Sequence, residues 1–356
     1  MKRCSKCILT ETYPRIVFDA KGVCNYCNNY KIKDIKVEEN LLRTIDKYRN
    51  HNSKYDCAVG ISGGRDSAYV AYYAKKTLKL NILAFTVDNG LMTEGAKKNV
   101  KNTVQILGID HVTIKYNYLL RSFRTSLSTW IRSPSPAMLG LLCTGCNSCI
   151  LKGIARIVEK YRIPFCLHGE GEPENCDDES TFQELLLRFP GVRLKRVSLL
   201  LGFSKEVLKN PLYILNPMYL FAIMNEYYYR YLFNINRKKN YIGLFDYIQW
   251  DEKEIMTKIK NELGWKKPDL INYSWRSDCK IHQLRQYLYM ETLGITKNDG
   301  ALSNMIREKL MKREDAIKLI KKYNDMSRPF LSDFLNEFGF SLDELDKVLQ
   351  KKGVVV

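Results

Sequence analysis

An octapeptide early in the chain holds residue types that suit the binding of an anion: Gly60-Ile61-Ser62-Gly63-Gly64-Arg65-Asp66-Ser67. Gly63 and Gly64 have no Cβ, so the backbone there can approach a phosphate closely. A helix beginning just after them would direct its unpaired N–H groups and partial positive charge to the same place. The hydroxyls of Ser62 and Ser67 can donate further hydrogen bonds. Asp66 can cap the helix or help to hold a metal ion.

The same octapeptide contains S-G-G-x-D-S, which resembles the PP-loop signature of enzymes that cleave ATP between its α and β phosphates. The Walker pattern G-x-x-x-x-G-K-[ST] and the pattern G-x-G-x-x-G are both absent. A tight turn with a capping aspartate is the structural alternative. The resemblance implies two groups of site residues: catalytic Ser62, Asp66 and Ser67, and ATP-binding Gly63, Gly64 and Arg65.

Two further candidates follow later strands. Asp88 ends an apolar run, where such folds place a carboxylate near the ribose and adenine of the nucleotide; a turn residue is the alternative. Gly169 and Glu170 follow another apolar run. Glu170 is a candidate ligand for Mg²⁺, and a plain loop is the alternative there.

Short apolar runs and helical stretches alternate around these motifs, which predicts a doubly wound parallel sheet of the PP-loop, HUP-like kind with ligands at the carboxyl ends of its strands. We expect strands at 57–61, 81–87, 111–114 and 163–167, and helices at 67–78, 95–107 and 150–161. After about residue 235 the pattern is helical, as in 252–263 and 313–322, with little strand signal. We therefore expect a zinc-ribbon arm over 1–45, an ATP-pyrophosphatase domain over 46–235 and a helical region over 236–356.

The arm has cysteines in the spacing C-x2-C-x16-C-x2-C, at Cys4, Cys7, Cys24 and Cys27. Each pair predicts a metal-binding knuckle, and two knuckles supply four thiolates to a tetrahedral Zn²⁺. Four thiolates leave no position for water, so the predicted role is structural. An arm of this size needs its metal in order to fold.

A second cysteine group, Cys143, Cys146 and Cys149, precedes the helix expected at 150, and Cys279 is a candidate fourth member. Three interpretations stay open: a metal or [4Fe-4S] site with a distant ligand, a catalytic sulfur carrier, or a loop of small residues.

The net charge of the chain only partly limits which kind of molecule it could bind. The formal charge of +18 suits nucleic acid, an anionic membrane or a phosphorylated small molecule, but the basic residues are scattered. No apolar segment follows the first residues, so we expect no secretory signal and a cytoplasmic protein. The apolar stretch 213–233 contains too many polar groups for a membrane span and predicts a buried, tyrosine-rich helix.

With these residues in place, the chain resembles the N-acetyl sugar amidotransferase family of PP-loop ATP pyrophosphatases, within the adenine nucleotide alpha hydrolase-like superfamily. The resemblance covers the cysteine arm with its run from Phe18 to Cys24, the PP-loop and the central cysteines. It fades over about 175–240 and resumes weakly at 297–299 and 313–316.

That family implies ATP, Mg²⁺ and Zn²⁺ as cofactors and a nucleotide sugar as substrate, in surface (lipopolysaccharide) polysaccharide biosynthesis. AMP is transferred to the acetamido oxygen, and ammonia from a glutaminase partner then displaces AMP. No glutaminase nucleophile is evident in this sequence, so ammonia would come from another chain.

Two alternatives remain. A PP-loop sulfurtransferase, such as a tRNA thiolase, would use the central cysteines for Fe–S or persulfide chemistry, and the positive charge would suit tRNA. A non-catalytic zinc-ribbon adaptor that binds nucleic acid is the third hypothesis. An adaptor would not need Ser62, Asp66 and Ser67 together.

Overall fold

The computed structural model describes residues 2–351 apart from 33–34, 49–52, 170–178, 218–219, 222–223, 226–227, 229–240 and 269–272. The candidate Mg²⁺ ligand Glu170 lies outside the described residues.

Five parallel strands form one sheet in the order β3-β2-β1-β4-β5. The chain runs outward from β1 through β2 to β3 and then returns to the other side of β1. The predicted doubly wound sheet is therefore confirmed, with its switch point between β1 and β4, where such folds bind ligands. The strands are β1 (Cys57–Gly60), β2 (Ile82–Asp88), β3 (Asp110–Lys115), β4 (Cys166–His168) and β5 (Tyr241–Gly243).

Strand β5 corrects one expectation, because it lies beyond residue 235, where the sequence predicts helices and shows little strand signal. It pairs in parallel with β4, with Cys166 opposite Tyr241 and His168 opposite Gly243. Three residues are too few to show an alternating or apolar pattern in the sequence. The division of the chain at 45 and 235 stays a prediction.

Helices make up most of the rest of the described chain. A π-helical turn, Tyr73–Thr77, extends the third helix, and two 3₁₀ segments lie at Pro136–Cys143 and Leu244–Asp246. The helices are α1 (Asn25–Asn28), α2 (Glu38–Tyr48), α3 (Arg65–Tyr72), α4 (Glu94–Leu107), α5 (Leu119–Arg132), α6 (Thr144–Tyr161), α7 (Glu179–Leu187), α8 (Lys195–Lys209), α9 (Leu212–Leu215), α11 (Glu252–Leu263), α12 (Lys280–Leu293), α13 (Lys297–Arg307), α14 (Arg313–Tyr323), α15 (Arg328–Asn336) and α16 (Leu342–Lys351).

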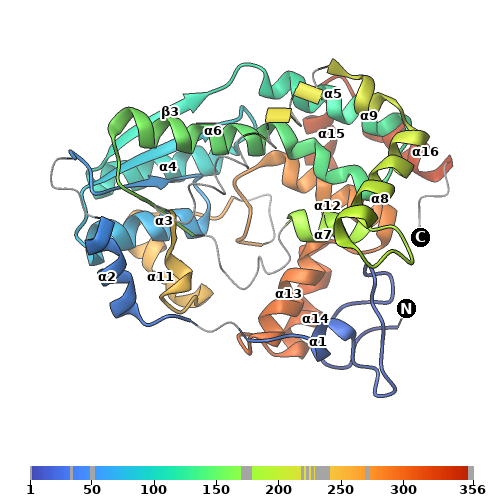
Figure 1. The fold of residues 1–356 in the computed structure, drawn as a ribbon, viewed down its shortest axis with the longest axis horizontal. Helices are drawn as coiled ribbons and strands as arrows, with labels where there is room; N and C mark the ends of the chain where they lie inside the picture. Colours follow the sequence, from blue (N-terminus) through green and yellow to red (C-terminus); the bar gives the residue numbers. More distant parts are fainter. Residues whose placement is uncertain are drawn as a thin grey trace.

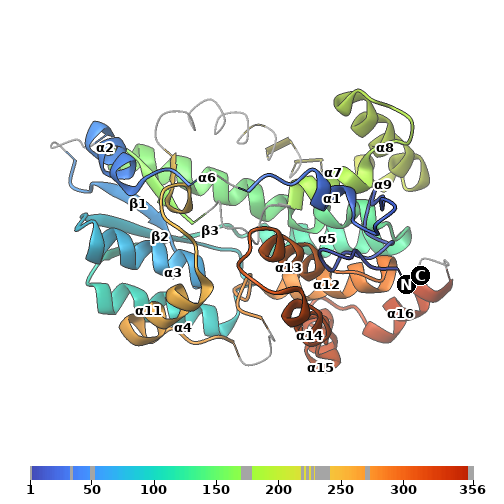
Figure 2. The same ribbon diagram turned by 90° about the horizontal axis from the view of Figure 1, so that it is seen from below.

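Helices cover both faces of the sheet, as Figure 2 shows, with α3, α4 and α11 on one side and α6 on the other. One apolar core joins the sheet to α3, α4 and α11, and a smaller one joins it to α6. Capping residues in the sequence determine where α4 and α11 begin and end. Thr93 and Asp251 cap their N-termini, and Gly108 and Gly264 end them in the left-handed conformation.

A second large core lies beside the sheet domain. It combines apolar residues of the cysteine arm with those of α5, the 3₁₀ segment at 136–143, α12, α15 and α16. In Figure 1 the arm and α1 lie next to α13 and α14, far from α2 and β3. The first and last parts of the described chain therefore pack together.

The sequence predicts a buried, tyrosine-rich helix over 213–233, but several side chains in the described part of this stretch are exposed. Tyr213 is buried, but Leu215, Phe221, Met224 and Tyr228 are each more than half exposed. A different stretch, Pro136–Tyr161, is long and apolar enough to cross a membrane, yet 53% of its window is buried inside the protein. A core helix has the same composition, so this is weak evidence for a span, and the expected absence of one stays a prediction.

Candidate active site

The PP-loop is a turn between β1 and α3 in which Gly63 has no space for a side chain. Gly63 has φ +81°, and a Cβ built on it would lie 2.2 Å from the carbonyl oxygen of Ala96 in α4. Gly64 is the N-cap residue of α3, and no side chain caps this end of the helix. Asp66 therefore does not have the capping role that the sequence allowed. The backbone thus turns tightly against α4 and directs the start of α3 to the edge of the sheet.

Two side chains that the sequence does not single out hold this turn. The carbonyl oxygen of Gly63 accepts hydrogen bonds from Asn99 Nδ2 at 3.1 Å and Trp265 Nε1 at 3.0 Å. Asn99 also bonds both backbone groups of Lys266. Both side chains are almost fully buried, so these bonds fix the loop from behind. No local sequence pattern reveals such partners, because they lie 36 and 202 residues away from Gly63.

The two serines of the motif close the loop. Ser62 Oγ lies 3.2 Å from Ser67 Oγ, and the backbone N–H of Ser62 donates to Ser67 Oγ. Gly64 N–H donates to Ser62 Oγ at 3.3 Å. The two hydroxyls therefore hold the turn closed, and their contact with a phosphate stays a prediction.

The side chain of Arg65 is buried between α3 and α11 and does not extend to the surface of the loop. Its guanidinium is buried and contacts Asp66 at 2.9 Å, Glu252 at 3.2 Å and Ser274 Oγ at 2.8 Å. It also lies 4.8 Å from the ring centre of Trp250. The geometry therefore makes Arg65 a brace between α3 and α11 and does not favour the expected contact with ATP.

Asp66 is oriented by this brace. Trp250 Nε1 donates to Asp66 Oδ1 at 3.0 Å, and Arg65 holds both carboxylate oxygens. A Cβ built on Gly169 would lie 3.3 Å from Asp66 Cβ, so the end of β4 reaches the loop as predicted. Asp66 keeps 20% of its side chain exposed, which leaves the carboxylate accessible to a cation at the switch point.

Asp88 closes the turn after β2. Its Oδ1 accepts the N–H of Gly90 at 2.9 Å, and Oδ2 lies 3.6 Å from Lys115. The turn is one in which Gly90 has φ +75°. Through these contacts Asp88 stabilises the turn after β2. Its contact with ribose stays a prediction.

The segment before α12 supplies a carboxylate to the loop. A Cβ built on Gly64 would lie 3.6 Å from Asp278 Oδ2. Thr93 fastens this segment, since its N–H donates to Asp278 O at 3.0 Å and its hydroxyl to Ser277 O at 3.1 Å. Asp278 is therefore a second acidic group beside the PP-loop, which sequence reasoning missed although the run Trp275–Cys279 is unusual.

Cys146 and Cys279 of the second group both contact Asn89, which follows β2, but among the described residues only the four arm cysteines lie close enough together to hold a metal ion. Asn89 Nδ2 contacts Cys146 Sγ at 3.3 Å and Cys279 Sγ at 3.8 Å. Arg285 donates to Cys143 Sγ at 3.4 Å. Helix α6 begins at Thr144, six residues earlier than predicted, so Cys146 lies on its first turns and not in a preceding loop.

Cys149 has a different hydrogen-bond partner. It is buried one turn further along α6, and its Sγ lies 2.9 Å from Tyr118 Oη. Burial raises the pKa of Cys146 well above its usual value and that of Cys279 to about 12. These thiols are therefore protonated at neutral pH unless a metal replaces the protons.

The four cysteines of the arm form the predicted cluster. Their sulfur atoms all lie within 4.8 Å of one another, with Cys7–Cys24 at 3.7 Å and Cys4–Cys27 at 4.0 Å. A tetrahedral ion with metal–sulfur bonds of about 2.3 Å requires sulfur separations of about 3.8 Å. Backbone N–H groups of Cys7 and Cys24 also donate to Cys4 Sγ. The donor set therefore suits a structural metal ion.

The arm is fastened to the C-terminal helices through its own knuckle. Arg313 donates to the carbonyl oxygens of Cys4 and Cys7, both at 3.0 Å. The N–H of Ile8 lies 3.4 Å from Ser303 Oγ. These contacts join the arm to α13 and α14.

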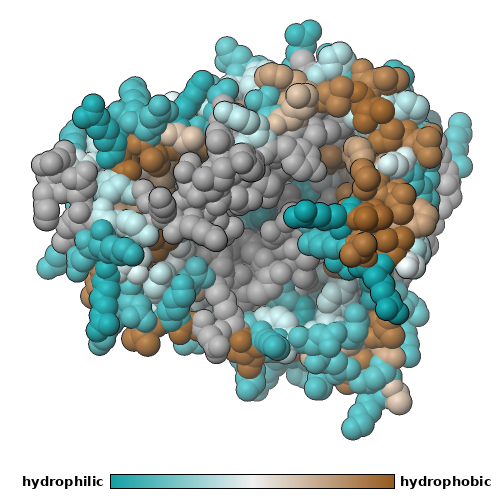
Figure 3. All heavy atoms as spheres, viewed as in Figure 1, coloured by the Kyte–Doolittle hydropathy of each residue, from teal (hydrophilic) through white to brown (hydrophobic). Residues whose placement is uncertain are grey.

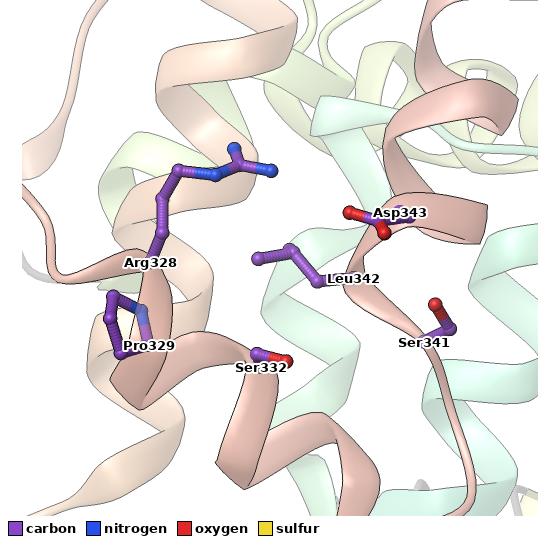
Figure 4. A pocket seen from close by; sticks show the side chains of 6 residues that line it. All are labelled: Arg328, Pro329, Ser332, Ser341, Leu342 and Asp343. Carbon is purple, nitrogen blue, oxygen red and sulfur yellow. The ribbon is translucent and has the colours of Figure 1, made fainter.

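A pocket of about 250 Å³ lies elsewhere, between α15 and α16. Arg328 and Asp343 stand on opposite sides of it (Figure 4). Arg328 is already paired with Asp346 at 2.6 Å. None of the predicted site residues lines this pocket.

Family models match two parts of the chain. Residues 37–134, which include the PP-loop, match the NAD synthase family. Residues 272–353 match the LPS biosynthesis protein WbpG-like, C-terminal domain. The predicted resemblance is thus confirmed at the level of these two matches: an NAD synthase-like segment with the PP-loop precedes a WbpG-like C-terminal segment, and the first of them indicates an ATP-using enzyme.

Individual relatives are distant. An uncharacterized protein of Methanocaldococcus jannaschii is 21% identical over 90% of this chain and 93% of its own length. A glutamine-hydrolyzing GMP synthase of Pyrobaculum aerophilum is 31% identical, but the match spans only 21% of that enzyme. A U34-tRNA thiolase structure from Methanococcus maripaludis, with its [4Fe-4S] cluster, has a TM-score of 0.35 at 14% identity, covering 90% of this chain and 89% of its own. A structural similarity with so low a TM-score supports no inference about the activity of this chain.

We predict that Gly63→Ala lowers the free energy of unfolding by about 3 kcal/mol or more, because a methyl group there meets the α4 backbone in a left-handed turn. Gly108→Ala is the matched control. It has a similar φ of +59°, but nothing lies within 4 Å of the added Cβ, so we expect a loss of about 1 kcal/mol. Urea denaturation measures both. Equal losses would contradict the tight approach of the loop to α4.

We also predict one tightly bound zinc ion per arm, measured by metal analysis of the purified protein. Cys24→Ser should lose it and expose residues 1–45 to protease, because three thiolates bind more weakly than four. Lys6→Ala, which changes an exposed side chain in the same knuckle, should keep both the metal and the protection. A metal-free wild-type protein with a protease-resistant arm would refute the site.

Proposed function

We propose that this chain is an ATP-dependent amidotransferase that acts on an N-acetylated nucleotide sugar in surface-polysaccharide biosynthesis. The observation that carries the proposal is the position of Asp278. It belongs to the WbpG-like segment and lies beside Gly64 of the PP-loop. The part of the chain related to LPS biosynthesis therefore lies beside the PP-loop, which supports a joint role of the two parts in one site.

The reaction has two steps. The acetamido oxygen attacks the α-phosphorus of ATP, the bond to the β-phosphate breaks, and pyrophosphate leaves. Ammonia then adds to the activated carbon, AMP leaves with the original oxygen, and a proton is lost to give an acetamidino group. A carbonyl oxygen leaves poorly by itself, so adenylylation makes the second step feasible.

The residues of the loop have distinct tasks in this scheme. Backbone N–H groups at the start of α3, with the hydroxyls of Ser62 and Ser67, stabilise the charge that develops on pyrophosphate. Asp66 and Asp278 would hold Mg²⁺, which would neutralise the same charge when bound. Arg65 keeps Asp66 in place. Ammonia would arrive from a glutaminase on another chain.

A sulfurtransferase is the second candidate, favoured by one observation. Cys146 and Cys279, which are distant in sequence, both contact Asn89 at the edge of the sheet, and an Fe–S or persulfide site would require such a convergence of thiols. The same ATP chemistry would then activate an oxygen of a tRNA base or another acceptor for replacement by sulfur.

We predict that Ser62→Ala and Asp66→Asn each reduce AMP and pyrophosphate formation at least about a hundredfold, since each removes a group that stabilises the transition state. The assay contains ATP, ammonium and a UDP-N-acetyl sugar. Asp333→Asn, an exposed carboxylate on α15, serves as the matched control and should keep full activity. Release of ADP and phosphate by the wild type would overturn the proposed reaction.

Anaerobic purification distinguishes the two candidates. The amidotransferase proposal predicts a colourless protein that gives an amidino product with ammonium. A brown protein would contradict it, provided that its Fe–S absorption band disappears in both Cys143→Ala and Cys279→Ala.

A further inference from the structure

Helix α8 presents an apolar stripe to solvent. Val197, Leu200, Leu201 and Leu208 are 44%, 65%, 41% and 83% exposed. Their spacing places them on one face of the helix, together with Ser204. Such a contiguous stripe differs from the single exposed apolar residues that every surface carries.

The orientation of α8 is fixed by its opposite face. Ser198, Gly202 and Glu206 are buried there. A Cβ built on Gly202 would overlap the carbonyl oxygen of Leu187 at the end of α7. The helix therefore cannot rotate to bury its leucines without losing this contact.

Arg196 and Lys205 border the stripe on its two sides, and further basic residues lie at the ends of the helix. Lys195, Arg196, Lys205 and Lys209 are exposed, and Arg193 lies just before the helix. Lys195 and Lys209 have acidic neighbours, Glu184 and Glu206. Glu206 is the single acidic residue in α8 and it is buried, so the exposed face of α8 carries positive charge alone.

The apolar surface continues beyond α8. Leu194 is 70% exposed before it, and Leu215 in α9 is 67% exposed. Figure 3 shows hydrophobic residues gathered over the side of the molecule where Figure 1 places α8 and α9. We call these residues, with the stripe and its basic borders, the α8–α9 surface.

We propose that the α8–α9 surface binds an anionic membrane, with α8 parallel to the lipid headgroups. Apolar side chains inserted at the interface, flanked by lysine and arginine, are the pattern of an interfacial helix. Anionic lipid complements both the local charge and the net charge of +18. A second copy of this chain fits less well, since a symmetric contact would place the basic borders against themselves. The inference does not depend on the proposed reaction.

Co-sedimentation with vesicles tests this. The wild type should bind vesicles of phosphatidylcholine mixed with phosphatidylglycerol, and bind pure phosphatidylcholine weakly. Leu200→Gln/Leu208→Gln should bind the mixed vesicles roughly tenfold or more weakly because the inserted area is lost. Arg196→Gln/Lys205→Gln should lose about tenfold or more on the mixed vesicles alone.

Leu42→Gln/Ile106→Gln is the matched control, since these side chains are 48% and 51% exposed on α2 and α4. It should bind like the wild type. All the altered side chains are exposed, so the melting temperature should not change. Failure of the wild type to bind mixed vesicles, or equal binding by every variant, would overturn the proposal. So would a concentration-dependent dimer that Leu200→Gln/Leu208→Gln dissociates, which would assign the surface to a second copy.

Discussion

The contact of Gly63 with the backbone of α4 is the constraint on which the site depends. The left-handed turn brings the loop so close that a single methyl group would collide with Ala96. Asn99 and Trp265 donate to the carbonyl oxygen of Gly63 from the buried side. Because these donors are buried and fixed, the turn before α3 has one conformation. The proposed anion site would therefore be formed before any ligand binds.

The C-terminal part of the chain completes this site from outside the sheet. The segment that carries Asp278 is tied to the turn after β2 by Thr93. Its continuation, α12, shares an apolar core with the cysteine arm, which Arg313 also fastens. The cysteine cluster is remote from the PP-loop in sequence, yet its arm packs on the helices that follow Asp278. A metal ion bound in the arm would therefore support the proposed ATP site indirectly.

Local patterns in the sequence predict much of this arrangement. The PP-loop and the two cysteine knuckles depend on short spacings, and the sheet follows from its apolar runs. The brace made by Arg65 with Glu252 could not be predicted, because those residues meet only through the packing of α3 on α11. The early start of α6 was missed because glycine and cysteine at 145–149 are weak helix formers. Their helical conformation depends on tertiary packing.

The central claim is that ATP activates an acetamido oxygen by adenylylation. Labelling that oxygen with oxygen-18 in the nucleotide sugar tests it directly, with mass spectrometry of the nucleotide and phosphate products. The account predicts the label in AMP and none in pyrophosphate, because the C–O bond breaks when ammonia displaces AMP. Unlabelled AMP beside a sugar that keeps its oxygen-18 would contradict the account.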